Sequence, residues 1–423
     1  MAIAQNSVEA VCAEAKAASR ELALLDSATK DRALNAIADA LDANADQIVE
    51  ANERDLEAGR ESGLEPALMD RLKLDRGRLA GIANDVRKIV TLEDPVGRLI
   101  REFKLYNGLD VRKVAVPLGV VAVVYEARPN VTIDAATLCL KSGNAIVLRG
   151  SSTAAHSNAV LAQVARDAIA AAGVPEAAIS IVQGGDRDEL RELATQEGVV
   201  DLIIPRGGEG LKDALKAVAT VPVIYAAAGN CHVYVDATAD LDKAEKIIVN
   251  AKVQRPGVCN AAETLLVHRD AAEQFLPRAF KALRADGVQL RGDADSQRIA
   301  SGAGESIDAA GDSDWDAEFL DLILAVKVVD SVDEAIDHIN AHGTGHSEAI
   351  VTDSQHAAQA FTQRVDAACV YVNASTRFTD GGEFGFGAEI GNSTQKLHAR
   401  GPIALRELCS YKYVVEGDGQ VRG

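Results

Sequence analysis

The sequence predicts an α/β fold built from two successive α/β domains and a projecting β-hairpin. Short apolar stretches alternate with helical stretches over residues 119–225, and a second series of the same kind covers residues 240–373. Such alternation indicates parallel sheets that are covered by helices on both faces. Before the first series stands Asn107-Gly108 between two strand-like runs, the strongest short signal for a hairpin. A chain of 423 residues is long enough for two or three domains.

The first ninety residues are predicted to be helical. Thr29 can cap a long amphipathic helix over residues 31–59. The apolar positions of this helix recur at helical spacing, at Leu34, Ile37, Leu41 and Ile48.

The hairpin is expected to pair residues 99–106 with residues 109–116. Charged residues stand between its apolar ones, and a long hairpin of this kind often projects and needs a partner. The pattern leaves two interpretations open, an oligomerisation arm and a local sheet edge.

The first α/β series divides at its apolar runs and glycines. Its strands are expected at residues 120–125, 145–149, 179–183, 201–205 and 221–225. The helices between them are expected at residues 133–141, 153–172 and 209–219. Parallel sheets bind ligands beyond the carboxyl ends of their strands, so functional residues are expected there.

The second series begins with a helix over residues 240–253. Its strands are expected at residues 264–267, 288–290, 322–328, 348–352 and 369–373, and a last strand at residues 410–415. Residues 301–313 are rich in Gly, Ala, Ser and Asp and are predicted to form a surface loop.

Composition excludes several classes of partner. The formal net charge of −19 argues against nucleic acid and anionic membranes, which both require clustered Lys and Arg. A small anionic substrate stays compatible, because one pocket can be positive on an acidic protein. The six cysteines form no CxxC pair and suit a reducing cytosol, so a cytoplasmic protein is expected. The apolar run over residues 114–125 is shorter than the roughly 20 residues that cross a bilayer.

Cys259 is a candidate nucleophile. It stands in the segment Gln254-Arg-Pro-Gly-Val-Cys-Asn-Ala-Ala-Glu263, on a predicted turn between a helix and an apolar strand. A turn can direct a side chain into a cleft, and positive charge such as that of Arg255 favours the reactive thiolate. Taken alone, the residue is more simply a small buried hydrophobe, as most free cysteines are.

Asn130 ends the segment Tyr125-Glu-Ala-Arg-Pro-Asn130, which follows an apolar strand. Because it opens a predicted helix, its side chain is expected to cap that helix. The alternative is that its amide donates a hydrogen bond to an oxyanion. On the residues alone, capping is favoured.

The turn at Arg206, Gly207 and Gly208 is a candidate phosphate site. It lies between a strand and a helix, where backbone N–H groups suit a pyrophosphate. It matches neither GxGxxG nor a Walker loop, so an ordinary βα turn is the alternative.

A second candidate phosphate site follows the strand that ends near Arg149. The segment Arg149-Gly-Ser-Ser-Thr153 provides a cation together with the hydroxyls of Ser151 and Ser152. An ordinary βα turn is again the alternative.

His338, His342 and His346 recur every four residues, the spacing of metal ligands on a helix. Gly343 and Gly345 interrupt that helix, and no fourth ligand is evident. No metal is therefore expected.

Four segments together resemble the gamma-glutamyl phosphate reductase family of the aldehyde dehydrogenase superfamily. They are residues 125–130, residues 254–260, the His/Gly run over residues 329–350, and Phe386-Gly-Ala-Glu-Ile-Gly-Asn-Ser-Thr-Gln-Lys-Leu-His398. The segments come in the family's order, and the resemblance covers nearly the whole chain. Four long motifs in order are far more specific than any one of them.

The resemblance implies a reaction. In it, NADPH reduces L-glutamyl 5-phosphate to L-glutamate 5-semialdehyde with release of phosphate, in proline biosynthesis. It implies Cys259 as the nucleophile that forms a thioester, with Asn130 and the Cys259 backbone N–H as donors to the oxyanion. Glu318 is similar to the superfamily glutamate that contacts the nicotinamide ribose, although an ordinary exposed acid is the alternative.

Two departures from the wider superfamily refine this expectation. Hydrolytic members of the superfamily carry a glutamate general base, and in the segment of this chain that resembles theirs Ala226 stands at the position of that glutamate. Without the base, water is poorly activated for attack on a thioester. An enzyme that passes its acyl group to or from phosphate needs no such base. Many members also hold the ribose hydroxyls of NAD with a glutamate, whereas Arg149 and its neighbours offer a cation that suits the 2′-phosphate of NADPH.

The amino and carboxylate groups of the substrate need partners as well. Six candidates lie in or near the matched motifs: Arg128, Arg255, His346, Ser375, Thr376 and Arg377.

The resemblance also implies an aldehyde dehydrogenase-like architecture. A Rossmann-type cofactor-binding domain is expected over residues 1–226, interrupted by the hairpin at 99–116, and a catalytic domain over residues 227–399. The hairpin and residues 400–423 would form an oligomerisation arm of a homodimer or homotetramer. Association with the glutamate kinase that supplies so labile an acyl phosphate is a further expectation.

Two rival functions remain open. One is another acylating or hydrolytic aldehyde dehydrogenase with a different substrate, and the other is a catalytically inactive scaffold of the same fold. Ala226 disfavours the hydrolytic kind, and the presence of both Cys259 and Asn130 disfavours the scaffold.

Overall fold

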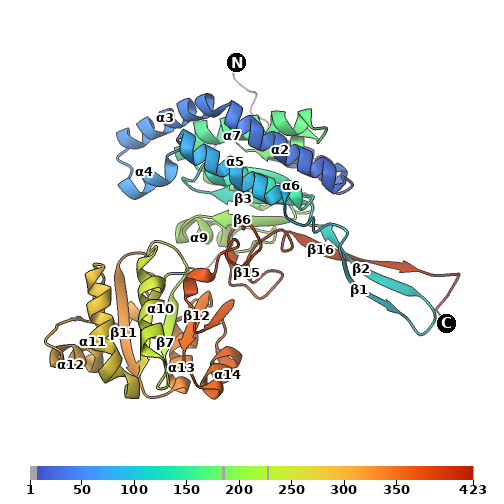
Figure 1. Cartoon of the computed structure of the whole chain (residues 1–423). Coiled ribbons are helices and arrows are strands. Elements are labelled where there is room, and N and C mark those ends of the chain that lie inside the picture. Colours follow the sequence, from blue (N-terminus) through green and yellow to red (C-terminus); the bar gives the residue numbers. More distant parts are fainter. Residues whose placement is uncertain (1–6, 183–185, 226–227, 423) are drawn as a thin grey trace. The chain divides into compact units, whose positions relative to one another are not determined.

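A computed structural model describes residues 7–182, 186–225 and 228–422, and this part of the chain forms two compact units (Figure 1). Unit 1 consists of Met1–Tyr225, Gly385–Gly391 and Ile403–Gly423. Unit 2 consists of Ala226–Phe384 and Asn392–Pro402. The assignment of cofactor binding to the first part and catalysis to the second stays a prediction.

Unit 1 begins with a helical layer, as predicted. Its helices are α1 (Val8–Leu22), α2 (Ser27–Ala43), α3 (Ala45–Glu61), α4 (Pro66–Leu72) and α5 (Arg76–Val90). The predicted apolar positions Leu34, Ile37, Leu41 and Ile48 are all fully buried.

Two details of this layer correct the prediction. The run over residues 31–59 is not one helix, because the chain breaks at Asn44, whose amide donates to the Ala40 carbonyl at 2.8 Å. A side chain that bonds the backbone in this way competes with helix continuation. The cap is also not Thr29: the Asp26 carboxylate accepts the Thr29 backbone N–H at 2.7 Å.

A parallel sheet with strand order β5-β4-β3-β6 forms the centre of unit 1. Its strands are β3 (Val120–Tyr125), β4 (Ala145–Gly150), β5 (Ile179–Ile181) and β6 (Leu202–Arg206). The helical segments after them are α6 (Asn130–Lys141), η1 (Ser152–Ala154), α7 (Ala155–Ala171), η2 (Glu176–Ala178), α8 (Arg187–Ala194) and α9 (Glu209–Val218). The predicted strands up to residue 205 are thereby confirmed, except that residue 183 lies outside the described residues.

The predicted strand at residues 221–225 is wrong as a full strand. Val223 makes an isolated parallel bridge with Ile203, and ladder pairing stops there. Pro222 has no N–H to donate, although its carbonyl accepts the Ile203 N–H at 2.9 Å.

The strand order of this sheet creates a topological switch point. From β3 the chain moves to β4 and β5 on one side and then returns to β6 on the other side. Ligands of open α/β sheets bind at such a point, beyond the carboxyl ends of the strands. The segments that emerge there are residues 126–130 after β3 and residues 207–208 after β6.

The hairpin is confirmed, and the last strand joins it. β1 (Leu99–Lys104), β2 (Asp110–Pro117) and β16 (Cys409–Glu416) pair antiparallel in the order β1-β2-β16. Figure 1 shows red β16 alongside cyan β2. Gly108 takes φ = 90°, a left-handed value that favours glycine in the turn.

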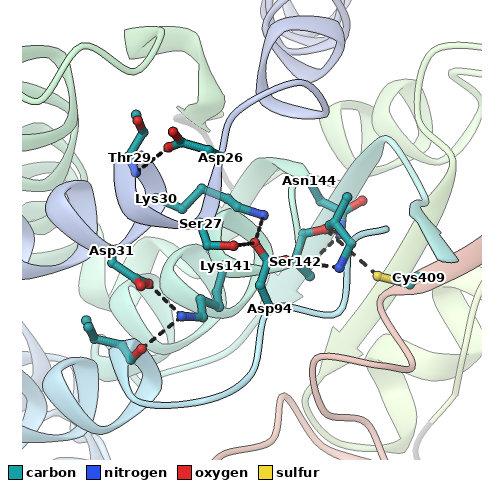
Figure 2. A network of polar contacts seen from close by, with 12 residues as sticks. Asp26, Ser27, Thr29, Lys30, Asp31, Asp94, Lys141, Ser142, Asn144 and Cys409 are labelled. Carbon is teal, nitrogen blue, oxygen red and sulfur yellow. Dashed lines mark hydrogen bonds and ion pairs between the residues drawn. The ribbon is translucent and has the colours of Figure 1, made fainter. Parts of the chain in front are cut away.

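Buried polar contacts tie this sheet to the helices of unit 1 (Figure 2). Lys141 donates to Asp31 at 2.5 Å and to the Val90 carbonyl at 2.9 Å, and Lys30 pairs with Asp94. Asn144 donates to the Leu408 carbonyl at 2.9 Å, directly before β16 begins. The lysine contacts join α2, α5, α6 and the segment before β1, and the Asn144 contact holds the residue before β16 next to the end of α6.

Unit 2 is a second α/β sheet, in the order β10-β9-β11-β8-β7-β12-β13. Its strands are β7 (Cys231–Val235), β8 (Ala262–His268), β9 (Gln289–Gly292), β10 (Asp308–Ala309), β11 (Ile323–Val329), β12 (Ser347–Val351) and β13 (Cys369–Val372). The predicted strands here are confirmed. The predicted loop at 301–313 also holds the end of α12, strand β10 and the start of η3.

Helices cover both faces of this sheet. They are α10 (Leu241–Val253), α11 (Arg269–Ala285), α12 (Ala294–Gly302), α13 (Val332–His342) and α14 (Gln355–Arg364), with η3 (Asp312–Asp316) and η4 (Thr376–Phe378). Val233 and Val235 pack with α10 to α12, whereas Tyr234 between them packs with α13 and α14. The short pair β14 (Asn392–Ser393) and β15 (Gly401–Pro402) completes the unit.

Candidate active site

Cys259 lies on a turn, as predicted, between the end of α10 and the start of β8. Its side chain is half-buried. The other cysteines, Cys12, Cys139, Cys231, Cys369 and Cys409, are buried. A partly exposed thiol on a turn suits a nucleophile, because a reactant can reach it. By contrast, burial raises the pKa of the Cys139 and Cys409 thiols, which disfavours their reactive thiolate forms.

The loop before β7 packs directly against the cysteine backbone. A Cβ atom on Gly229 would lie 1.5 Å from the Cys259 carbonyl oxygen, so a glycine is required by this close approach. The Cys231 thiol donates to the same carbonyl at 3.2 Å. Asn230 donates its amide to the Trp315 and His342 carbonyls at 2.7 and 3.0 Å. The backbone of the nucleophile turn is therefore held by fixed neighbours.

The predicted substrate residues of η4 are docked on the same turn. The Thr376 hydroxyl donates to the Asn260 carbonyl at 2.7 Å, and Arg377 Nε donates to Gln254 Oε1 at 2.7 Å. Asn260 returns its amide to the Thr379 carbonyl at 2.9 Å. Gln254 and Asn260 were not predicted as site residues, although both belong to the segment that carries Cys259.

Ser375 and Arg255 complete this side of the site in different ways. Ser375 is buried and accepts the Arg377 backbone N–H at 3.3 Å, as the cap of η4. Arg255 is exposed beside the turn. Burial, and then the like charge of Arg255, lower the pKa of Arg377, whereas Asp380 and Cys259 oppose that shift. The two guanidinium groups thus form a positive region next to Cys259.

His346 lies in the same unit and is linked to η4 through hydroxyl groups. Its Nδ1 is 2.8 Å from Ser347 Oγ, which is 2.5 Å from Thr379 Oγ1. Burial lowers the pKa of His346 to about 4, so the ring is neutral at physiological pH. As a neutral ring it can orient a substrate group but does not supply a positive charge.

Glu318 contacts the loop before β7. Its Oε1 accepts the Gly229 backbone N–H at 2.6 Å. Gly229 therefore links Glu318 to the Cys259 carbonyl, and all three residues belong to unit 2.

Asn130 is the first residue of α6 and lies in unit 1, at the switch point. The capping prediction is wrong: Pro129 takes the cap position, and no side chain caps the helix. The Asn130 amide instead donates to Asp134 Oδ2 at 2.8 Å. Burial raises the pKa of Asp134 to about 6, although the Asn130 hydrogen bond and Arg206 oppose the shift. Asp134 fixes one amide hydrogen and leaves the second for an external acceptor.

The Arg206-Gly207-Gly208 turn lies beside Asn130 at the same switch point. The Gly208 backbone N–H donates to Glu126 Oε2 at 3.0 Å, and a Cβ on Gly207 would lie 2.7 Å from the Glu126 carboxyl carbon. A carboxylate thus stands where a helix N-terminus attracts anions. The turn can bind an anionic oxygen, and the Glu126 carboxylate occupies that position. Sequence reasoning missed Glu126, since its contact spans more than 80 residues.

Arg149 is largely buried at the end of β4 and has protein partners. Its Nη2 donates to the Asp186 carbonyl at 2.7 Å, and its Nε is 3.4 Å from Glu189 Oε1. Burial lowers the pKa of Arg149, although the charges of Glu189 and Asp186 oppose the shift. Ser151 caps η1 through the Thr153 N–H at 3.2 Å, and Ser152 is exposed.

Arg128 lies in unit 1, between Glu126 and Asn130, and its backbone N–H donates to the Glu126 carbonyl. Most of the predicted residues form two groups, and the other three, Arg149, Ser151 and Ser152, lie at the end of β4 and the start of η1. Unit 1 brings together Arg128, Asn130, Arg206, Gly207 and Gly208 at the switch point. Unit 2 brings together Cys259, Arg255, Glu318, His346, Ser375, Thr376 and Arg377 around the turn before β8. Ala226 lies outside the described residues.

The histidine run is not a single helical face. His338 and His342 lie on α13 with ring centroids 4.5 Å apart, whereas His346 follows the glycines beyond the helix. Among the described residues, no cluster of His, Cys, Asp and Glu has the geometry to hold a metal ion. None of the helices in the described ranges is long and apolar enough to span a bilayer.

The chain is similar to known proteins over nearly its whole length. The model of the aldehyde dehydrogenase family matches residues 1–297 and 315–414. The chain is 51% identical to a gamma-glutamyl phosphate reductase of Clostridium novyi over 418 residues, 99% of each chain. It is 53% identical to one of Halothermothrix orenii over 409 residues, 97% of each chain. The crystal structure of the gamma-glutamyl phosphate reductase of Thermotoga maritima superimposes with a TM-score of 0.96 at 44% identity, covering 99% of this chain and 100% of that one.

Proposed function

Because the chain belongs to the aldehyde dehydrogenase family and, within it, to the gamma-glutamyl phosphate reductases, we propose that it reduces L-glutamyl 5-phosphate to L-glutamate 5-semialdehyde. The reductant is NADPH, phosphate is released, and the product serves proline biosynthesis. The observation that carries the proposal is the half-buried Cys259 thiol, held on a turn beside Arg255 and Arg377.

The chemistry begins at Cys259. Its thiolate attacks the acyl carbon of the substrate, a C–S bond forms, and the bond from that carbon to the phosphate oxygen breaks. The negative charge that develops on the acyl oxygen is stabilised by the Cys259 backbone N–H and by the Asn130 amide, each typically worth about 3–4 kcal/mol. The hydrogen bond from Asn130 to Asp134 orients that amide in advance.

NADPH, when bound, supplies the hydride that reduces the thioester carbon. The C–S bond then breaks, the thiolate of Cys259 leaves, and the aldehyde is set free. The positive region at Arg255 and Arg377 suits the substrate carboxylate, and the hydroxyls around Ser375 and Thr376 suit its polar groups. His346, as a neutral ring, adds a hydrogen-bonding group without a charge.

The residues of unit 1 fit a nicotinamide dinucleotide, the cofactor type of this family. The Gly208 N–H already binds a carboxylate oxygen of Glu126, so the start of α9 accepts anionic oxygens. Arg206, Gly207 and Gly208 would hold the pyrophosphate once Glu126 moves aside. Arg149 would hold the 2′-phosphate of NADPH with Ser151 and Ser152 once it releases Glu189 and the Asp186 carbonyl. Glu318, in unit 2, would hold the nicotinamide ribose.

Three finer expectations belong to the same proposal. The three-stranded arm of β1, β2 and β16 would join copies of the chain into a dimer or tetramer, since Tyr411, Tyr413 and Val415 are exposed on it. The reaction would take place in the cytoplasm, because no disulfide joins the cysteines in the described part of the chain. Association with the glutamate kinase would protect the labile acyl phosphate in transit.

The reverse reaction tests the proposal. NADP⁺ reduction by glutamate 5-semialdehyde is measured with and without phosphate, for the wild type and for Cys259→Ala. Phosphate-dependent activity that is lost in Cys259→Ala supports the reaction and the nucleophile. Activity that is independent of phosphate indicates a hydrolytic enzyme and contradicts the proposal.

A further inference from the structure

A buried ion pair brackets the turn that carries Cys259. Lys252 lies in the last turn of α10, and Glu263 lies near the start of β8. Both side chains are fully buried, and Lys252 Nζ is 2.5 Å from Glu263 Oε2. The pair therefore joins the two ends of the segment that contains the nucleophile, across a separation of 11 residues.

A fully buried ion pair adds little net stability to a fold. Desolvation of two charges offsets most of their attraction, and apolar residues of similar size are often as stable or more stable. Burial acts against both charges here, because it raises the pKa of Glu263 and lowers that of Lys252 despite their mutual attraction. A polar pair at this position therefore points to a role in geometry.

The second oxygen of Glu263 reaches another part of the site. Its Oε1 accepts the backbone N–H of Leu320 at 3.2 Å. Leu320 takes φ = 54°, a left-handed value that is unfavourable for a leucine and persists when the surroundings hold it. Leu320 follows Glu318 by two residues, so the ion pair holds the loop that presents Glu318.

That loop returns to the nucleophile from the other side. Glu318 accepts the Gly229 N–H at 2.6 Å, and Gly229 packs against the Cys259 carbonyl so closely that no Cβ fits between them. Contacts thus lead from Glu263 through the Glu318 loop and Gly229 to Cys259, and the chain from Cys259 to Glu263 closes this circuit of contacts within unit 2.

We propose that Lys252 and Glu263 are positioning residues that set the Cys259 turn and the Glu318 loop in one fixed relation. They touch neither reacting group and act through the backbone of both segments. The roles given to Cys259 and Glu318 rest on the proposed function, whereas the circuit of contacts does not depend on it.

The test replaces the pair by apolar side chains of similar length, in the double variant Lys252→Met with Glu263→Leu. This variant removes the desolvation cost and also the acceptor for the Leu320 N–H. We expect a folded protein in which the KM for NADPH rises about tenfold, as the loss of one charged hydrogen bond predicts. The rate of Cys259 alkylation by iodoacetamide should shift by a similar factor, with the modified residue identified by mass spectrometry.

Two further variants separate positioning from stability. Glu263→Gln keeps one acceptor oxygen in place of two, so it can accept from either the Leu320 N–H or Lys252. Its KM should lie between those of the wild type and the double variant, and it stands in if the double variant does not fold. Lys30→Met removes another buried ion pair, with Asp94 in unit 1 (Figure 2), and should lower the melting temperature without changing the KM or the alkylation rate.

Folded variants of Lys252 and Glu263 with wild-type KM and wild-type alkylation rate would overturn the inference. Equal effects in Lys30→Met would also overturn it, since they would trace to stability in general. Alkylation needs neither substrate nor cofactor, so this comparison still decides the inference if the wild type shows no phosphate-dependent activity.

Discussion

Replacing Gly229 by alanine perturbs the nucleophile without touching its side chain. The new Cβ would lie 1.5 Å from the Cys259 carbonyl oxygen, 2.3 Å from its carbonyl carbon and 2.6 Å from its Cα. All three are backbone atoms, so no side-chain rotation relieves the overlap. Either the loop before β7 or the Cys259 turn has to move.

The size of the displacement follows from ordinary contact distances. A carbon and a carbonyl oxygen approach to about 3.3 Å at closest, so the two segments must separate by about 1.8 Å. Misplacement of a reacting group by about 1 Å can cost about 100-fold in rate, or roughly 3 kcal/mol of transition-state stabilisation. We therefore expect Gly229→Ala to lose at least about 100-fold in kcat.

Gly257 offers a matched control on the same turn. It precedes Cys259 by two residues, and a Cβ there would meet nothing closer than the Leu320 carbonyl at 3.7 Å, an ordinary contact. Gly257→Ala should keep near-wild-type activity in the phosphate-dependent assay, while Gly229→Ala should also alter the rate of Cys259 alkylation. Wild-type kcat and alkylation rate in a folded Gly229→Ala variant would refute the reasoning.

Two other predictions concern Asn130 and His346. Asn130→Ala should lower kcat by about 100–1,000-fold with little change in NADPH affinity measured by titration, because it removes one donor to the oxyanion; a kcat within a few-fold of the wild type would exclude that role. His346 takes up a proton only near pH 4 when folded but near pH 6.5 when unfolded, so stability should fall by about 3 kcal/mol as the pH drops through that window. His346→Gln should flatten this dependence in denaturant titrations between pH 7 and about pH 4, and an unchanged slope would show that other groups cause it.

The sheet of unit 1 could be predicted because its strands are buried on both faces. The predicted strand at residues 120–125 agrees with β3 at both ends, since a continuous apolar run leaves little choice. The break at Asn44 could not be predicted in this way, because the apolar spacing continues across it. The break depends on a side-chain hydrogen bond to the Ala40 carbonyl that no periodicity reveals.

The candidate site could be predicted by its segments and not by its contacts. The segment that carries Cys259 was evident, yet the attachment of Gln254 and Asn260 to η4 joins residues more than 110 positions apart. The contact of the Asn130 side chain could not be predicted either. Pro129 takes the cap position, and the Asp134 carboxylate, one turn later, accepts a hydrogen bond from the Asn130 amide. Glu126 at the Gly208 N–H and the Lys252–Glu263 pair likewise depend on tertiary placement.

The central claim is that Cys259 carries the acyl group as a thioester that phosphate resolves. The most direct test mixes the enzyme rapidly with NADP⁺ and glutamate 5-semialdehyde in the absence of phosphate and follows NADPH formation. The account predicts a burst equal to the concentration of active sites, a mass increase on the peptide that contains Cys259, and steady turnover once phosphate is added. Steady turnover without phosphate, or a burst that persists in Cys259→Ala, would contradict it.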